Sequence, residues 1–515
     1  AQAISAQAHL SGESSRRSGG PSMWRALFDP TASLKALLPC CFGSGEKPAS
    51  RRSSDWLEPL DGLRAIALLW VLVFHCFYIV YGTSGQDEVV RDDAARHWWL
   101  QFLNTGGEGV DIFFVLSGLL IAKNYNKVTA EETEGDFLQR YRSFLLRRFF
   151  RLWPVMAAYV VASFVYLIST QGDVEPFNRW SWSYLVFVAN FSNDAMKCPM
   201  LGHLWSVCVE MQMYILTPFI CELTYNRKSR AMRPAAVERL IIMSAVCVFV
   251  RTFLVLGPDR EAIYVEVWPP PQLYIACLAR FSPYVSGVCV SLMLESSGSI
   301  GASTLRSKIW NTLLDLLAFA GLIAATIFGA GENAYLLAIL QGKTFSKEIE
   351  RIHDTHNALR TREDMAVLGE PFLAQCVRIW FRPLLGWCLA RLMYRVLLAK
   401  EAGPLRAAQW FLSIRALRAI ALLSYAAYVF QGLFYFPARA LKSSWGLSWS
   451  PPPDPMVNRL KTFLAYIIFV ALCLAAALPV HFLIETPGMR LGKLVEEACT
   501  QRCSQRKGDI EEGKR

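Results

Sequence analysis

The sequence has few charged residues for its length. Asp, Glu, Lys and Arg make up 18% of the 515 residues, whereas a typical soluble chain has about a quarter. Hydrophobic residues make up 53%. They fall in blocks of about 20 residues, the length that a helix needs to cross the hydrocarbon core of a bilayer. The shortage of charge excludes an ordinary soluble domain and predicts an all-α, polytopic integral membrane protein.

The sequence also lacks paired cysteine motifs. Its 14 cysteines are scattered, with no CxxC pair and no spacing typical of a metal site. We therefore expect neither a disulfide framework nor a bound metal. The adjacent Cys40 and Cys41 lie beside a weakly amphipathic run near basic residues. That setting suits either palmitoylation or two free thiols in a disordered tail.

Motifs for nucleic-acid binding are missing as well. The net charge is +11, but no zinc-finger spacing and no aromatic-basic motif accompanies it. In a membrane protein such an excess reflects the basic residues of the cytosolic loops. The sequence therefore predicts membrane lipids as partners and no nucleic acid.

Ten apolar blocks are predicted to cross the membrane. They cover residues 62–82, 107–123, 151–169, 202–222, 240–257, 273–295, 310–330, 380–399, 417–437 and 462–484. The segment 183–191 is too short to cross, and we expect it to be re-entrant or interfacial.

Basic residues gather in alternate loops. The 123–151 and 223–239 connections and the loop before the ninth span are rich in Lys and Arg, whereas the 83–106 and 170–201 connections have two each. Loops rich in basic residues stay in the cytosol. This pattern predicts that both termini are cytosolic, although the 438–461 loop fits the alternation less well.

Composition divides the chain into three parts. Residues 1–55 are rich in Ser, Arg and Gly and predict a disordered, basic cytosolic tail. The chain begins with Ala, from which we expect further residues upstream. Residues 56–490 are predicted to form a transmembrane domain with a long loop at 331–379, and residues 491–515 a charged cytosolic tail.

Two polar side chains share one face of the first span. Arg64 lies near its start, and His75 lies eleven residues further on. Eleven residues make about three full turns, so both side chains point to one side, about 16 Å apart along the helix. Charged groups inside a span are costly and are candidates for function. A lone histidine also serves as a hydrogen bond between helices, and that alternative stays open for His75.

Other polar residues are predicted to reach the depth of His75 in the outer half of the membrane. They are Asp111 in the second span, Glu210 in the fourth, Arg280 in the sixth and Gln431 in the ninth. His203 lies seven residues before Glu210 and shares its face. The alternative for Asp111 and Arg280 is an ion pair that only stabilises the bundle, and Glu210 could instead bond to His203 or an indole.

The basic segment "RRFFRLWP" leads into the third span. Arg148 and Arg151 are three residues apart and would share a helical face. Two guanidinium groups on one face suit an anion such as a phosphate. The alternative is ordinary cytosolic charge with a tryptophan at the membrane interface.

Six segments, in order, resemble the acyltransferase-3 family of multi-span enzymes, which includes bacterial O-acetylases and the nose-resistant-to-fluoxetine proteins. The resemblance covers about residues 58–490. It rests on "LDGLRAIALLWVLVFH", "GVDIFFVLSGLLI", "RRFFRLWP", "HLWSVCVEMQMY", "LSYAAYVFQ" and "FLIETPGMRL". Two positions depart from the family pattern: Gln431 stands where a histidine is usual, and Met211 where a second acidic residue is usual.

The resemblance implies transfer of an acyl group, such as acetyl, from cytosolic acyl-CoA to a hydroxyl of a glycan or lipid on the lumenal or extracellular side. Acyl-CoA is then a co-substrate, and no permanently bound cofactor is expected. In this hypothesis His75 is the base, oriented by Asp111 or Glu210. Arg280 steadies the oxyanion, and the phosphates of the donor meet three arginines: Arg64, Arg148 and Arg151. The alternatives are a lipid or proton-coupled transporter and an inactive, lipid-binding family member.

Overall fold

The computed structural model describes residues 57–81, 105–131, 136–170, 172–256, 275–296, 305–328, 372–445 and 455–512. The predicted N-terminal tail, with Cys40 and Cys41, lies outside the described residues. So does most of the predicted 331–379 loop, although a helix begins at Phe372, inside that range.

Each of the ten predicted spans overlaps a helix. These helices are α4 (Glu58–Tyr81), α7 (Gly109–Glu131), α8 (Phe137–Ser169), α11 (Trp205–Thr224), α12 (Ala236–Leu256), α15 (Phe281–Ser296), α16 (Leu305–Phe328), α20 (Phe372–Leu397), α22 (Arg415–Phe430) and α24 (Pro455–Val480). Apolar blocks form helices because a helix satisfies its backbone N–H and C=O groups internally, without water. The prediction of an all-α protein is confirmed. In the described residues the strands are two short ones, β1 (Tyr225–Asn226) and β2 (Ala231–Met232), paired antiparallel.

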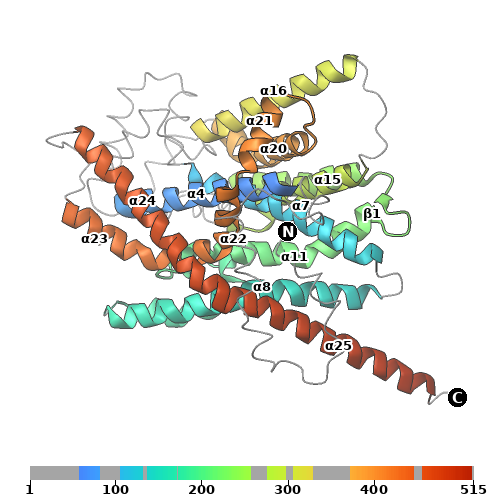
Figure 1. Cartoon of the computed structure of the whole chain (residues 1–515), viewed down its shortest axis with the longest axis horizontal. Helices are drawn as coiled ribbons and strands as arrows, with labels where there is room; N and C mark the ends of the chain where they lie inside the picture. Colours follow the sequence, from blue (N-terminus) through green and yellow to red (C-terminus); the bar gives the residue numbers. More distant parts are fainter. Residues whose placement is uncertain are drawn as a thin grey trace.

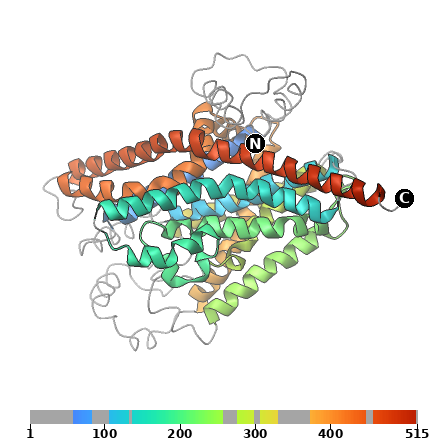
Figure 2. The same ribbon diagram turned by 90° about the horizontal axis from the view of Figure 1, so that it is seen from below.

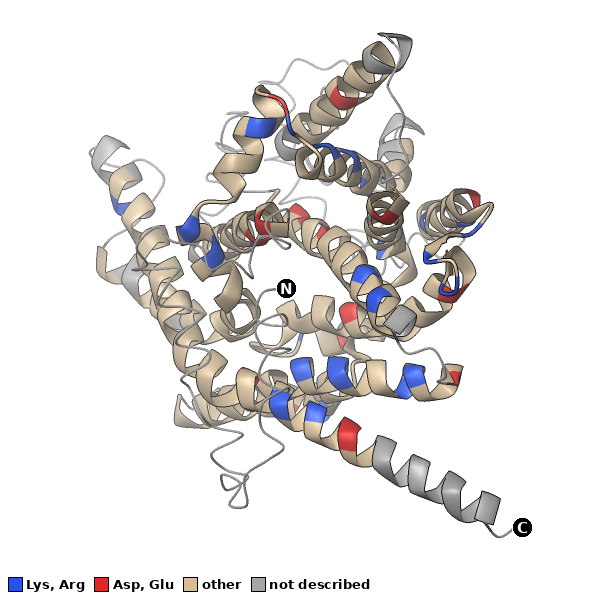
Figure 3. Ribbon diagram, turned by 45° about the vertical axis from the view of Figure 1, so that its right-hand side comes forward, with Lys and Arg blue, Asp and Glu red and all other residues tan. Residues whose placement is uncertain are grey.

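Six segments of the described chain are long and apolar enough to cross a membrane. They are Glu58–Phe77, Phe137–Ser169, Gly202–Thr224, Ala236–Leu256, Arg415–Phe434 and Phe463–Cys499. Figure 3 shows long stretches of helix without a charged position. Among the helices outside this set, α15 has only 16 residues, and α7 and α20 carry several charged residues. The helices are those of a multi-pass membrane protein, and the count of ten spans stays a prediction.

Two helical segments extend further than the sequence predicts. α8 begins at Phe137 rather than near residue 151 and continues through Pro154. The basic segment therefore lies within a helix and not at its entrance. α24 continues through a π-helical turn, His481–Glu485, into α25 (Thr486–Glu512). Figure 2 shows α25 as the red helix that extends beyond the rest of the bundle.

The short connection before α11 is as expected for a segment that cannot cross. Within the predicted 183–191 piece, α9 (Glu175–Leu185) ends and a 3-10 turn, Ala189–Phe191, follows. A single-turn helix, α10 (Asn193–Met196), and a second 3-10 turn, Gly202–Leu204, lead into α11. His203 lies in that second turn.

The centre of the bundle is the pair α7 and α15, which pack closely on each other. Figure 1 shows α4, α7, α11 and α15 in the middle, with α16 and α20 on one side and α8 on the other. A Cβ atom added at Gly118 would lie 2.0 Å from the backbone oxygen of Tyr284, and one added at Gly287 would lie 2.0 Å from that of Val115. Glycine on each helix therefore permits this close backbone approach, as small residues do in membrane bundles.

Candidate active site

A small cavity lies between five helices of the bundle. It is formed by α4, α7, α8, α11 and α22. Its lining residues are Arg64, Val110, Phe113, Phe114, Ser117, Arg151, Leu152, Ser206, Val207, Glu210, Ser424, Tyr425 and Tyr428. Most of this surface is apolar, with a few polar groups at fixed places. An apolar lining with a few fixed polar groups is the pattern of a ligand site.

Two arginines in this cavity are available for a ligand. Within the described part of the chain, neither Arg64 nor Arg151 makes a salt bridge. Other arginines of α8 are paired: Arg147 donates to Glu496 at 2.6 Å. A guanidinium group without a carboxylate partner, inside a largely apolar cavity, favours an anionic ligand.

Arg148 takes a different position from its neighbour Arg151. Its guanidinium group lies over the rings of Phe144 and Tyr214, 5.5 and 5.8 Å from the ring centroids. It is buried and does not line the cavity. The structure thus brings Arg64 and Arg151 together in the cavity and places Arg148 behind its wall.

Glu210 lies at the same end of the cavity as these arginines. Ser117 donates a hydrogen bond to its Oε1 atom at 2.9 Å, and Tyr214 donates to the same oxygen. Arg64 lies close enough for an electrostatic attraction. The carboxylate therefore has two hydroxyl donors and a nearby cation, which fix its orientation.

Beyond the other end of the cavity lies a group of rings that we name the histidine cluster: His75, His203, Tyr159, Tyr428 and Tyr435. The centroids of the two imidazole rings are 6.2 Å apart. Tyr435 lies 6.2 Å from His75 and 6.0 Å from His203, and Tyr159 lies 5.5 Å from His203. The cluster borders the cavity through Tyr428, which belongs to both.

Polar contacts fix one of the two imidazoles. Nε2 of His203 lies 3.0 Å from the backbone oxygen of Val429. Gln431 lies beside His75 and donates from its Nε2 atom to the backbone oxygen of Tyr428 at 2.9 Å. The Nδ1 atom of each histidine is buried and has no hydrogen-bond partner in the described residues. Two ring nitrogens thus lack a hydrogen-bond partner within the described chain, although neither histidine lines the cavity.

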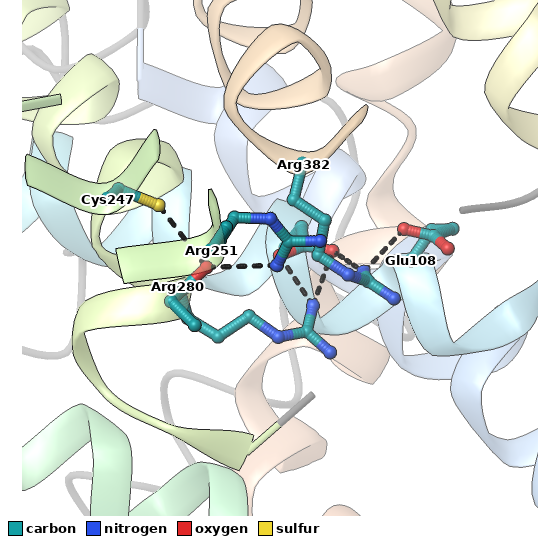
Figure 4. Close-up of polar contacts among 7 residues, drawn as sticks. Glu108, Cys247, Arg251, Arg280 and Arg382 are labelled. Carbon is teal, nitrogen blue, oxygen red and sulfur yellow. Dashed lines mark hydrogen bonds and ion pairs between the residues drawn. The ribbon is translucent and has the colours of Figure 1, made fainter. Parts of the chain in front are cut away.

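Asp111 and Arg280 belong to a separate buried group of charges, of which Figure 4 labels Glu108, Arg251, Arg280 and Arg382. Arg280 donates from Nη1 to both carboxylate oxygens of Asp111 at 2.8 Å. Arg382 bonds to Asp111 as well, and its Nη1 atom lies 2.7 Å from Glu108. Arg251 donates nearby to the backbone oxygens of Ile379 and Ala279 at 3.0 and 3.3 Å.

The structure separates residues that the sequence predicts to lie together. Neither carboxylate proposed to orient His75 is bonded to it: Asp111 pairs with two arginines, and Glu210 bonds to Ser117 and Tyr214. Glu210 lies at a different depth from the histidine cluster, because it follows His203 by two helical turns. The ion pair considered as an alternative for Asp111 and Arg280 is present. Catalytic roles for Asp111, Glu210 and Arg280 stay predictions.

Several residues of these sites were missed from the sequence. Arg382 and Glu108 complete the charge group, but they are 274 positions apart, and no spacing rule joins them. Two of the cluster tyrosines, Tyr159 and Tyr435, lie among ordinary aromatic residues of apolar blocks. His203 carried a usable signal, because it shares a helical face with Glu210.

The fold and this cavity agree with one class of membrane enzyme. Residues 58–481 match the profile of the family described as "Acyltransferase domain". The chain belongs to this acyltransferase family, and the resemblance seen in the six sequence segments is confirmed.

The chain is also similar in sequence to curated proteins of an animal and of bacteria. The regulator of hypoxia-inducible factor 1 of Caenorhabditis elegans is 27% identical over 300 residues, 52% of this chain and 56% of the relative. The putative peptidoglycan O-acetyltransferase YrhL of Bacillus subtilis is 27% identical over 286 residues, covering 53% and 39%. Peptidoglycan O-acetyltransferase OatA of Listeria monocytogenes is 27% identical over 231 residues, covering 42% and 32%.

These matches are partial. The chain spans about half or less of the length of these relatives. No solved structure matches the chain. Among the described residues, no group of three or more His, Cys, Asp or Glu side chains is arranged to hold a metal ion.

Proposed function

We propose that this protein is an integral membrane O-acyltransferase that moves an acyl group, such as acetyl, from cytosolic acyl-CoA to a hydroxyl of a glycan or lipid. The observation that carries the proposal is the cavity, which has two arginines without salt bridges to the described residues at one end and borders the histidine cluster through Tyr428 at the other. Family membership and two relatives named as O-acetyltransferases support the reaction class.

The proposed topology has ten spans with both termini in the cytosol and the acceptor on the lumenal or extracellular side. The alternation of basic loops supports this orientation. It places the start of α4, with Arg64, toward the cytosol, and His75 in the outer half. The donor then enters at the arginine end and the acceptor approaches from the other.

In the donor half of the cavity, Arg64 and Arg151 bind phosphate oxygens of acyl-CoA. Arg148, packed behind on Phe144 and Tyr214, adds positive charge without direct contact. Arg64 and His75 are about 16 Å apart along α4 by helix rise. A thin pantetheine arm along this face would bring the thioester toward the histidine cluster.

The reaction needs a base for the acceptor hydroxyl. His75 takes the hydroxyl proton, and the oxygen attacks the thioester carbonyl. The carbon–sulfur bond then breaks, and the imidazolium returns its proton to the thiolate of CoA. Gln431, in place of a histidine, lies beside the base and holds the adjacent backbone. Glu210 orients the cavity wall at the donor end.

The decisive experiment uses membranes that contain the full chain. They are incubated with radiolabelled acetyl-CoA, and labelled lipids and glycans are separated. His75→Gln should reduce labelling by at least about 100-fold, the usual contribution of a general base, with membrane abundance unchanged. Full labelling by this variant would show that His75 is not the base.

The donor site is tested with matched arginine variants. Arg64→Gln and Arg151→Gln should each raise the KM for acetyl-CoA about tenfold, because each removes a charged hydrogen bond to phosphate. Arg147→Gln is the control, since it removes the same charge from α8 but Arg147 is already paired with Glu496. Equal KM changes in all three variants would show that the total positive charge affects the KM, and not direct contacts of Arg64 and Arg151 with phosphate.

Two rival functions have definite outcomes in the same assay. A transporter, or an inactive member that only binds lipid, labels no acceptor under any condition. The departure at Gln431 is the feature that favours an inactive member. Labelling that depends on His75 and on the two cavity arginines decides against both.

A further inference from the structure

His203 is held rigidly by contacts from α22. The Nε2 atom of His203 faces the backbone oxygen of Val429 at 3.0 Å. The hydroxyl of Tyr428 donates a hydrogen bond to the backbone oxygen of His203 at 2.7 Å. The side chain is 8% exposed. Both the ring and the backbone of this residue are therefore fixed by the same neighbouring helix.

The contact with Val429 sets the tautomer of His203. A backbone carbonyl only accepts hydrogen bonds, so Nε2 must carry the hydrogen. In the neutral ring Nδ1 then holds a free lone pair. That atom is buried and makes no well-aligned hydrogen bond in the described residues, although the backbone of Met200 lies close to the ring. A buried acceptor without a partner is costly, and a fixed, unprotonated ring nitrogen is the form that a general base requires.

The position of His203 relative to the cavity supports the same role. Ser206 and Tyr428 line the cavity, and their hydroxyl oxygens are 2.6 Å apart. Because Tyr428 also bonds to the backbone of His203, this end of the cavity abuts the residue. A Cβ atom added at Gly432 would lie 3.1 Å from the imidazole and 1.9 Å from the hydroxyl of Tyr159. The glycine therefore lets the chain approach the ring closely.

The partner ring is that of His75. His75 has two polar neighbours, the backbone of Val71 and the side chain of Gln431, and its Nδ1 atom makes no well-aligned hydrogen bond among the described residues. Its centroid is 6.2 Å from that of His203.

We propose that His203 is a second catalytic histidine, and that its Nδ1 atom accepts the proton of the acceptor hydroxyl while His75 hydrogen-bonds to the reacting groups. The inference rests on the proposed function and changes one step of it: the hydroxyl proton assigned above to His75 goes to His203, and His75 keeps a hydrogen-bonding role at the reacting groups. The hydroxyl proton moves to Nδ1, the carbon–oxygen bond forms and the carbon–sulfur bond breaks. The proton then passes from the imidazolium to the thiolate of CoA.

The competing explanation is a hydrogen bond that only joins two helices. The variant His203→Gln separates the two explanations. Its amide nitrogen occupies the place of Nε2 and keeps the donor for Val429, but nothing replaces the basic Nδ1 atom. A structural role predicts activity near that of the wild type, whereas a catalytic role predicts its loss.

The experiment compares two nucleophiles in the same membranes. One is the endogenous hydroxyl acceptor, labelled from radioactive acetyl-CoA. The other is hydroxylamine, which attacks thioesters without a strong base, corrected for its reaction in membranes without the protein. For His203→Gln we expect hydroxyl transfer to fall by at least about 100-fold and protein-dependent transfer to hydroxylamine to stay within about threefold of the wild type. His203→Asn, whose amide is not basic, should behave the same way.

Each other result overturns the proposal. Equal losses with both nucleophiles mean that the substitution damages the fold and not proton transfer alone. Retained hydroxyl transfer means that the Nδ1 atom of His203 takes no part in proton transfer. His481→Gln is the control, because it removes another buried histidine, bonded to Glu485 at 2.8 Å, and should affect neither reaction. Wild-type membranes that label no acceptor and no hydroxylamine would refute the proposed function itself. An active wild type with an active His203→Gln refutes the role of His203 alone.

Discussion

Neutralising Asp111 should destabilise the folded protein, whatever role Asp111 has in the chemistry. Its carboxylate is completely buried and bonds to Arg280 through both oxygens and to Arg382. Glu108 pairs with the same Arg382. These four side chains carry two negative and two positive charges. The variant Asp111→Asn keeps the shape but leaves one positive charge uncompensated.

The expected cost is large because the group has no water to solvate it. Removing one partner of a buried ion pair costs about 3–5 kcal/mol. Since about 1.4 kcal/mol is a factor of ten in an equilibrium constant, the folded population relative to the unfolded falls by at least about 100-fold. The double variant Asp111→Asn with Arg280→Met restores neutrality and leaves the Arg382–Glu108 pair. It should recover most of the loss.

The assay is thermal unfolding of the detergent-purified protein, together with its abundance in membranes. Asp315→Asn is the matched control. Asp315 also bonds to two arginines, Arg391 and Arg395, both at 2.8 Å, but all three side chains are partly exposed. Its replacement should cost no more than about 1 kcal/mol. The reasoning is refuted if Asp111→Asn unfolds like the wild type, and in that case a loss of activity would assign Asp111 to the chemistry.

Further predictions concern packing, a buried arginine and salt. Gly118→Leu should prevent the protein from accumulating in membranes, because even a Cβ atom at this position lies 2.0 Å from a backbone oxygen of α15. Gly321→Ala meets only a cysteine side chain at 2.9 Å and should be tolerated. Normal membrane abundance of Gly118→Leu would contradict the close packing of α7 on α15. Arg251→Met should cost about 2 kcal/mol in thermal unfolding, since two backbone carbonyls lose their donors, and an unchanged unfolding curve would show that water replaces them. The KM for acyl-CoA should rise with ionic strength, because salt screens the cavity arginines from phosphate, and a salt-independent KM would count against that donor site.

Much of the fold follows from the sequence because its causes are local. The apolar blocks predict helices, and each predicted span overlaps one. The boundaries were less accurate: α8 begins at Phe137 and α25 continues to Glu512. Amphipathic and polar stretches that extend a helix outside the membrane lack the apolar signal used to mark spans.

Helical periodicity predicts that Arg64 and His75 share one face of α4. Arg64 lines the cavity, and His75 lies in the histidine cluster, which borders the cavity through Tyr428. Gln431 lies beside His75, as its predicted depth requires. Periodicity is a property of one helix, so it determines which side chains share a face and says nothing about which helix that face will meet.

The tertiary structure decided the partners. The sequence offers Asp111 or Glu210 to His75, but Asp111 meets Arg280 and Arg382 and Glu210 meets Ser117 and Tyr214. His203 lies beside His75 although they come from distant segments. The sequence by itself thus determined a helical membrane protein of an acyltransferase family and the polar residues that its helices carry. The structure alone decided which of these residues meet, because that depends on how closely helix backbones approach, on glycines such as Gly118 and on the pairing of buried charges.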